Sequence, residues 1–145
     1  MKIESTKVIV NASPEVVMHF LSDARNIEYL LPTGKISDFK ATEEECSFKV
    51  QGGVIISLIE DGKTEFTELY LKSGKGTPFP FRLTIALKDI DKLTEGQILF
   101  DGEVNMFLKM MVEKPLTALF NYMSEKLKDY YDQNPVSASA RPAED

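Results

Sequence analysis

Apolar and polar positions along the first part of this chain change period near residue 13. Residues 8–10 form a short β-branched run that is typical of a strand. The next segment favours a helix, because Ser13 is a good N-cap and Pro14 suits the first helical position. Apolar residues then recur at helical spacing, which predicts a helix over about residues 14–22.

Strands are predicted from residue 35 to about residue 104. A second short helix, which Asp23 can cap, comes before them and should end at Pro32, because proline disfavours helical backbone in the preceding residue. The strands are expected near residues 35–40, 44–51, 53–60, 64–72, 80–88 and 96–104. Six sequential strands with no helix between them predict an antiparallel meander.

A long helix is predicted at the end of the chain, over about residues 106–132. After Pro115 its apolar residues are three and four apart, so this half should lie on the sheet. Residues 106–112 are apolar almost all round, which indicates apolar contacts on more than one side. Pro115 predicts a kink or a break, because it cannot donate a helical hydrogen bond. The tail, residues 134–145, should be disordered, which leaves one domain over residues 1–133.

This order of elements resembles the helix-grip fold of the START-like (SRPBCC) superfamily of polyketide cyclases and lipid-transfer proteins. The most telling residues are 8–17, followed by Phe20-Leu21-Ser22-Asp23 and Leu31-Pro32. The resemblance covers residues 1–132 and implies an α+β fold of order β-α-α-β6-α, in which a curved antiparallel sheet wraps around the C-terminal helix. It also implies an apolar cavity between sheet and helix, which members of the superfamily use for hydrophobic molecules.

The expected cavity residues are inward-facing apolar side chains of the last two strands and of the start of the last helix. They are Phe81, Leu83, Ile85, Phe100, Phe107 and Met111. Alternation with mostly polar residues, which Leu99 interrupts, assigns the strand members to the covered face of the sheet. The two helix members belong to the segment that is apolar all round, which suits an adaptable pocket entrance or, alternatively, a homodimer contact.

Candidate catalytic groups are few. His19 is the single histidine, which excludes sites that need two, and it follows Glu15 by four residues as a paired surface residue would. Cys46 is the single cysteine, and alternation makes it an inward-facing packing residue. A carboxylate facing the cavity would have a raised pKa and could act as an acid or a base. Candidates for such a group are Glu65, Glu68, Asp101 and Glu103.

Charge and apolar content argue against two classes of partner, nucleic acids and membranes. Seventeen Lys and Arg against twenty-three Asp and Glu give a net charge of −6, which repels phosphate backbones, so no nucleic-acid partner is expected. No apolar run approaches the ~20 residues that span a bilayer, and the N-terminus lacks the apolar core of a signal peptide. We therefore expect a cytoplasmic protein with no stable membrane insertion.

The function expected from these observations is that of a non-enzymatic binding or carrier module. Its ligand would be a small hydrophobic molecule, lipid-like or polyketide-like, bound in the cavity of a monomer or homodimer. No catalytic residue is assigned, and no metal or cofactor is expected. Two alternatives remain open: an enzyme of the polyketide cyclase or dehydrase type that acts mainly by confining its substrate, and a protein-interaction domain whose cavity has collapsed.

Overall fold

A computed structural model describes residues 1–50 and 53–135 of the chain. The elements are, in order, β1 (Lys2–Glu4), β2 (Val8–Val10), α1 (Pro14–Leu21), the 3-10 helices η1 (Ala24–Leu30) and η2 (Thr33–Lys35), β3 (Ile36–Ala41), β4 (Glu45–Val50), β5 (Val54–Thr64), β6 (Glu68–Ser73), β7 (Phe81–Ile90), β8 (Leu93–Gly102) and α2 (Met106–Gln133). Apart from the additional strand β1, this order confirms the predicted one. Most of the tail that we expect to be disordered lies outside the described residues.

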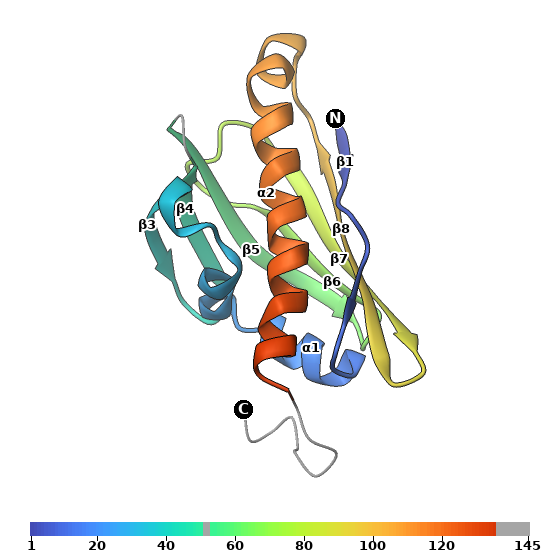
Figure 1. The fold of residues 1–145 in the computed structure, drawn as a ribbon. Coiled ribbons are helices and arrows are strands. Elements are labelled where there is room, and N and C mark those ends of the chain that lie inside the picture. The colour runs from blue at the N-terminus through green and yellow to red at the C-terminus, as the bar shows by residue number, and fades with distance from the viewer. Residues whose placement is uncertain (51–52, 136–145) are drawn as a thin grey trace.

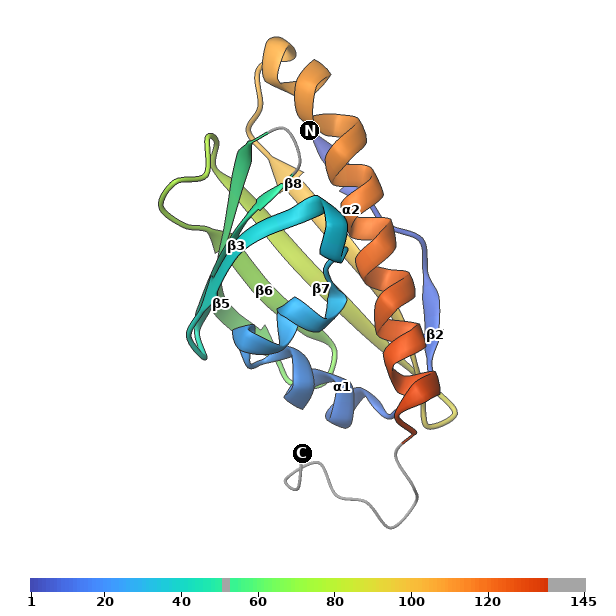
Figure 2. The ribbon, with the colours of Figure 1, turned by 60° about the vertical axis from the view of Figure 1, so that its left-hand side comes forward.

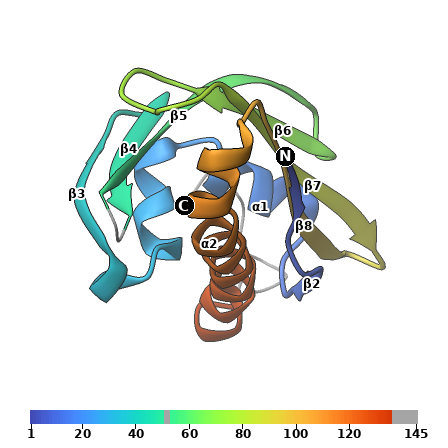
Figure 3. The same cartoon turned by 90° about the horizontal axis from the view of Figure 1, so that it is seen from above.

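The strands form one curved antiparallel sheet. Its order is β1-β8-β7-β6-β5-β4-β3, and β2 also pairs with β8. The six strands from β3 to β8 therefore lie side by side in sequence order, as the meander predicts. The sheet curls around α2, with α1 and η1 closing one end (Figures 1 and 3).

Helix α2 packs its apolar stripe against the concave face of the sheet. Its buried residues include Leu116, Phe120 and Leu127, at the spacing that keeps side chains on one helix face. The Phe120 ring lies 5.3 Å from Phe100 of β8, and Phe100 lies 5.1 Å from Phe81 of β7, measured between ring centroids. Aromatic pairs at such distances attract beyond their area burial. The α+β helix-grip architecture is thus confirmed.

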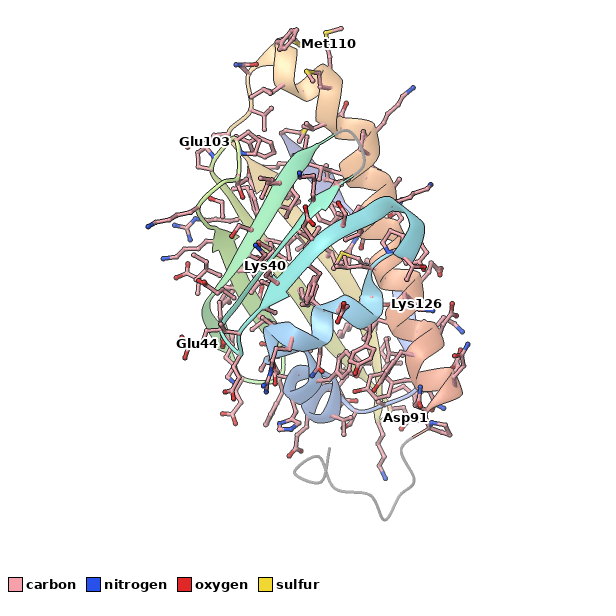
Figure 4. All side chains as sticks on the ribbon, turned by 90° about the vertical axis from the view of Figure 1, so that its left-hand side faces the viewer. Lys40, Glu44, Asp91, Glu103, Met110 and Lys126 are labelled. Carbon is pink, nitrogen blue, oxygen red and sulfur yellow. The ribbon has the colours of Figure 1, made fainter. Side chains whose placement is uncertain are left out.

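The predicted break at Pro115 is absent, and most of the apolar contacts expected for residues 106–112 are not formed. The helix continues without a break through Pro115, because Pro115 and Met111 are both exposed and water can replace the missing hydrogen bond there. Most of residues 106–112 lack these contacts, because the first turns of the helix extend past the end of the sheet (Figure 2), and Val112 alone in this segment is buried. Met110, labelled in Figure 4, keeps 79% of its surface exposed.

The hairpin between β7 and β8 is tighter than the predicted turn over residues 89–95. Asp91 and Lys92 both have positive φ angles, 52° and 73°. Two central residues in the left-handed region form the two-residue turn that matches strand twist. The sequence signal is weak because neither residue is glycine, and β8 consequently starts three residues before the predicted position.

Ser5 lies between β2, which is the first predicted strand, and the additional strand β1, and it joins both to α2. The Ile98 backbone N–H donates to Ser5 Oγ at 2.8 Å, so a side chain replaces a backbone acceptor between the strands. Ser5 Oγ also lies 2.8 Å from Ser124 Oγ of α2, and both serines are buried. A few residues away, the Thr6 N–H donates to Asn121 Oδ1 at 2.9 Å. One side of α2 is thereby fixed to the β1–β2–β8 edge.

We expect Ser5→Ala to cost more stability than Ser124→Ala. Ser5→Ala leaves the buried Ile98 N–H without its acceptor, at a cost of about 1–3 kcal/mol, whereas Ser124→Ala leaves Ser5 with other partners and costs about 1 kcal/mol. Urea unfolding measures both, with the exposed Ser37→Ala as the control. Equal losses of unfolding free energy in Ser5→Ala and Ser124→Ala would contradict this role of the Ser5 hydroxyl.

Candidate functional site

An open groove lies between the middle of α2 and the segment that leads into β3. Its volume is about 630 Å³, within the range of roughly 300–1,000 Å³ typical of small-molecule sites. The lining residues are Pro32, Thr33, Gly34, Lys35, Ile36, Val50, Pro115, Ala118, Leu119 and Tyr122. Figure 2 shows this segment, in cyan, beside the middle of α2.

Helical spacing and strand register bring the groove residues together. Positions 115, 118, 119 and 122 are three and four apart, so they share one side of α2. Across from them, Ile36 of β3 pairs with Val50 of β4 in the sheet register. Leu119 and Val50 are buried and Ile36 is half-buried, so the deep part of the groove is apolar.

The groove has a polar side that comes mainly from η2. Thr33 and Lys35 are exposed there, and Tyr122 of α2 keeps 40% of its surface exposed. Among the groove residues that the structure describes, Lys35 carries the sole formal charge. The site therefore combines an apolar floor with a rim that offers one ammonium and two hydroxyl groups.

A second hollow, of about 670 Å³, lies at the other end of α2, against α1 and η1. Its polar groups hold the local fold: Arg25 donates to the Asp23 carboxylate at 2.6 Å, and the Asn26 amide donates to the Phe20 carbonyl at 2.9 Å. The hydrogen bond from Arg25 holds the pKa of Asp23 below its usual value. His19 lines this hollow and is exposed, but no ion pair among the described residues joins it to Glu15. The polar groups here stabilise η1, so the apolar groove is the better ligand site.

The structure separates the predicted cavity residues into two groups. Phe81, Leu83, Ile85 and Phe100 are buried under α2, whereas Phe107 and Met111 are 71% and 56% exposed. None of the six is among the residues that line the groove. Phe107 and Met111 nevertheless lie on the same side of α2 as the groove residues. Positions 107, 111, 115, 118 and 122 follow one another three or four apart along the helix.

Side chains fill most of the interior around the four buried residues, Phe81, Leu83, Ile85 and Phe100. A cavity lined by Ile85, Ile98 and Met123 measures about 10 Å³, room for one water molecule at most. The larger space lies at the edge of α2, where η2 and the paired strand residues Ile36 and Val50 supply the opposite wall. Sequence reasoning missed this groove because Pro32-Thr33-Gly34 resembles a plain turn, and residues 32–36 carry no apolar periodicity.

Neither Cys46 nor the candidate acids supply a catalytic group to the groove. Cys46 is buried, and burial together with the neighbouring Glu45 charge raises the pKa of its thiol to about 12. The thiol is therefore protonated at neutral pH, which confirms the packing interpretation. Glu65, Asp101 and Glu103 are exposed. Glu68 is half-buried and accepts a 2.9 Å hydrogen bond from the Tyr70 hydroxyl.

Residues 1–50 and 53–135 contain no group of three or more His, Cys, Asp or Glu side chains placed to hold a metal ion. Within the same residues, no helix is both long and apolar enough to cross a membrane.

Comparison with known proteins identifies the fold. No protein-family model matches the sequence, and no curated protein matches it. Among solved structures, a protein of Thermus thermophilus is 13% identical with a TM-score of 0.71, over 93% of this chain and 99% of that one. A START superfamily protein of Mycobacterium smegmatis is 14% identical with a TM-score of 0.67, over 92% and 98%.

The KanY protein is 11% identical with a TM-score of 0.71, over 91% of this chain and 97% of that one. This chain has the START-like helix-grip fold. Such low identities show the fold and leave the ligand open, because one fold supports many functions. The predicted resemblance is therefore confirmed at the level of architecture.

We expect Cys46 to be nearly inert in the folded protein. At pH 8 the raised pKa leaves so little thiolate that alkylation by iodoacetamide should be on the order of a thousandfold slower than in urea-unfolded protein. Mass spectrometry over time measures both rates, with glutathione as the control thiol. Similar rates in folded and unfolded protein would contradict the burial of Cys46.

Proposed function

We propose that this protein binds a small hydrophobic ligand in the groove between α2 and η2. The observation that carries the proposal is the groove itself, with a ligand-sized volume of about 630 Å³ and an apolar floor of Leu119, Val50 and Ile36. Apolar groups leaving water for such a floor gain free energy in proportion to the area that they bury. The START-like fold supports the same class of function.

Binding is better supported than catalysis by the groove lining. Its described residues include no carboxylate, imidazole or thiol, which are the usual acids, bases and nucleophiles near neutral pH. A polyketide cyclase of the confining type would need such a group only if its substrate required proton transfer. A carrier or sensor needs shape and apolar surface, and the groove supplies both.

Ligand binding should be measurable with N-phenyl-1-naphthylamine, a neutral apolar probe whose fluorescence rises out of water. We expect wild-type protein to bind it and Ala118→Trp to bind at least about tenfold more weakly, because the indole would fill the groove beside Leu119. Ala118 is exposed, so the substitution should leave the fold intact.

Glu125→Trp is the matched control for this substitution. Glu125 is exposed on the same helix and does not line the groove, so its replacement should leave probe affinity unchanged. Equal affinities in Ala118→Trp and Glu125→Trp would place the probe elsewhere. Absence of binding to folded wild-type protein would favour the interaction-domain alternative.

Ligand should also stabilise the folded protein. A ligand that binds the native state alone, at one hundred times its dissociation constant, adds about 2.7 kcal/mol by mass action. For a domain of this size the midpoint of thermal unfolding should rise by roughly 5–10 °C. A thermal-shift titration with the naphthylamine probe measures this rise, which should be absent in Ala118→Trp. A similar rise in that variant would contradict the site.

A further inference from the structure

The charge in the groove is opposite in sign to the charge of the protein. The chain has a net charge of −6, yet the groove lining carries one formal charge, the ammonium of Lys35. None of the described lining residues is acidic. Because the overall field repels anions, a local cation at an apolar groove selects for a ligand with a complementary group.

Lys35 is available to such a ligand. Within residues 1–50 and 53–135 no ion pair includes Lys35, as is also true of other lysines such as Lys40, whereas Lys49, Lys72, Lys109 and Lys128 each have a carboxylate within 4.0 Å. The acid nearest to Lys35 along the chain, Asp38, pairs with Lys49 at 3.7 Å. The position of Lys35 is set by its own backbone, since its N–H donates to the Pro32 carbonyl at 3.1 Å and closes the η2 turn.

Two hydroxyl groups complete the polar side of the groove. Thr33 and Tyr122 both line it, and neither side chain has a hydrogen-bond partner among the residues that the structure describes. Each hydroxyl can donate a hydrogen bond to an anionic oxygen, and such charge-assisted bonds are stronger than neutral ones. The remaining wall and floor, from Ile36, Val50 and Leu119, offer apolar surface alone.

We infer that the natural ligand is an amphipathic anion, with an apolar body on Leu119, Val50 and Ile36 and its anionic group at Lys35. This inference rests on the proposed function and adds the chemical class of the ligand. A purely apolar molecule would gain nothing from the ammonium, and a cationic amphiphile would be repelled by it. Carboxylates and phosphate esters share the required head-group chemistry.

The test is displacement of N-phenyl-1-naphthylamine by ligands with the same ten-carbon chain and different head groups. Undecanoate, decyl phosphate, 1-decanol and decyltrimethylammonium are titrated against wild type, Lys35→Gln and Lys40→Gln at pH 8. Lys40 is an exposed residue of β3 outside the groove (Figure 4) and is the matched control. Both variants have the same change in net charge.

We expect Lys35→Gln to weaken binding of at least one anionic ligand by about three- to tenfold, as for a partly exposed charged hydrogen bond. The affinity for 1-decanol should stay unchanged in every variant, and Lys40→Gln should leave all affinities unchanged. Raising the salt concentration should weaken the anionic ligands and leave 1-decanol unaffected. The anion that loses more affinity in Lys35→Gln identifies the head group.

Three results would overturn the inference. Unchanged affinity for both anions in Lys35→Gln would show that Lys35 holds no head group. An equal loss of affinity for the anions in Lys40→Gln would show that the effect comes from the net charge of the protein and not from the position of Lys35. Tighter binding of decyltrimethylammonium than of either anion would reverse the charge preference. In each case 1-decanol still binds, so the proposed function stands. Failure of all four ligands and of the probe refutes the proposed function and the inference together.

Discussion

Burial of the α2 stripe in the concave face of the sheet is the contact on which the rest of this structure depends. Phe120 at the centre of the stripe packs on Phe100, and Phe100 packs on Phe81 of the next strand. A flat sheet would cover less of the helix stripe, so curvature of the sheet increases the apolar area that is buried. The same curvature determines where the sheet edges come to lie relative to the helix.

The two sides of α2 make different contacts with the rest of the chain. On the β8 side, buried hydrogen bonds through Ser5 and Ser124 hold the helix to the sheet. On the β3 side, the helix faces η2 across the groove, with Leu119 and Val50 at its base. A helix that is hydrogen-bonded along one edge and separated from the other suits the proposed ligand site, because sites held by packed elements keep a defined geometry.

The described interior cavity beneath α2 is small, whereas the groove at the edge of α2 has the volume of a small-molecule site. Aromatic side chains occupy the space beneath α2, and the cavity at Ile85 has the size of a single water molecule. Protein interiors pack to crystal-like density whenever side chains can meet. The groove persists because Pro32-Thr33-Gly34 presents no large side chain to fill it, while Ala118 is small enough to leave it open. The exposed Phe107 and Met111 extend the apolar surface of the groove toward the free end of α2.

Local sequence patterns determined the order of elements, the antiparallel meander, the capped α1 helix and the buried face of α2. These features follow from periodicity, caps and turns, which act between residues near in sequence. Tertiary structure alone decided that Ser5 joins β1 and β2 to β8 and α2, that the turns around Met110 extend past the sheet, and that Lys35 and Tyr122 line one groove. Periodicity states which face of an element is apolar, but the width of the space between two such faces depends on how far the sheet curves and which side chains meet there. That is a property of the packed molecule.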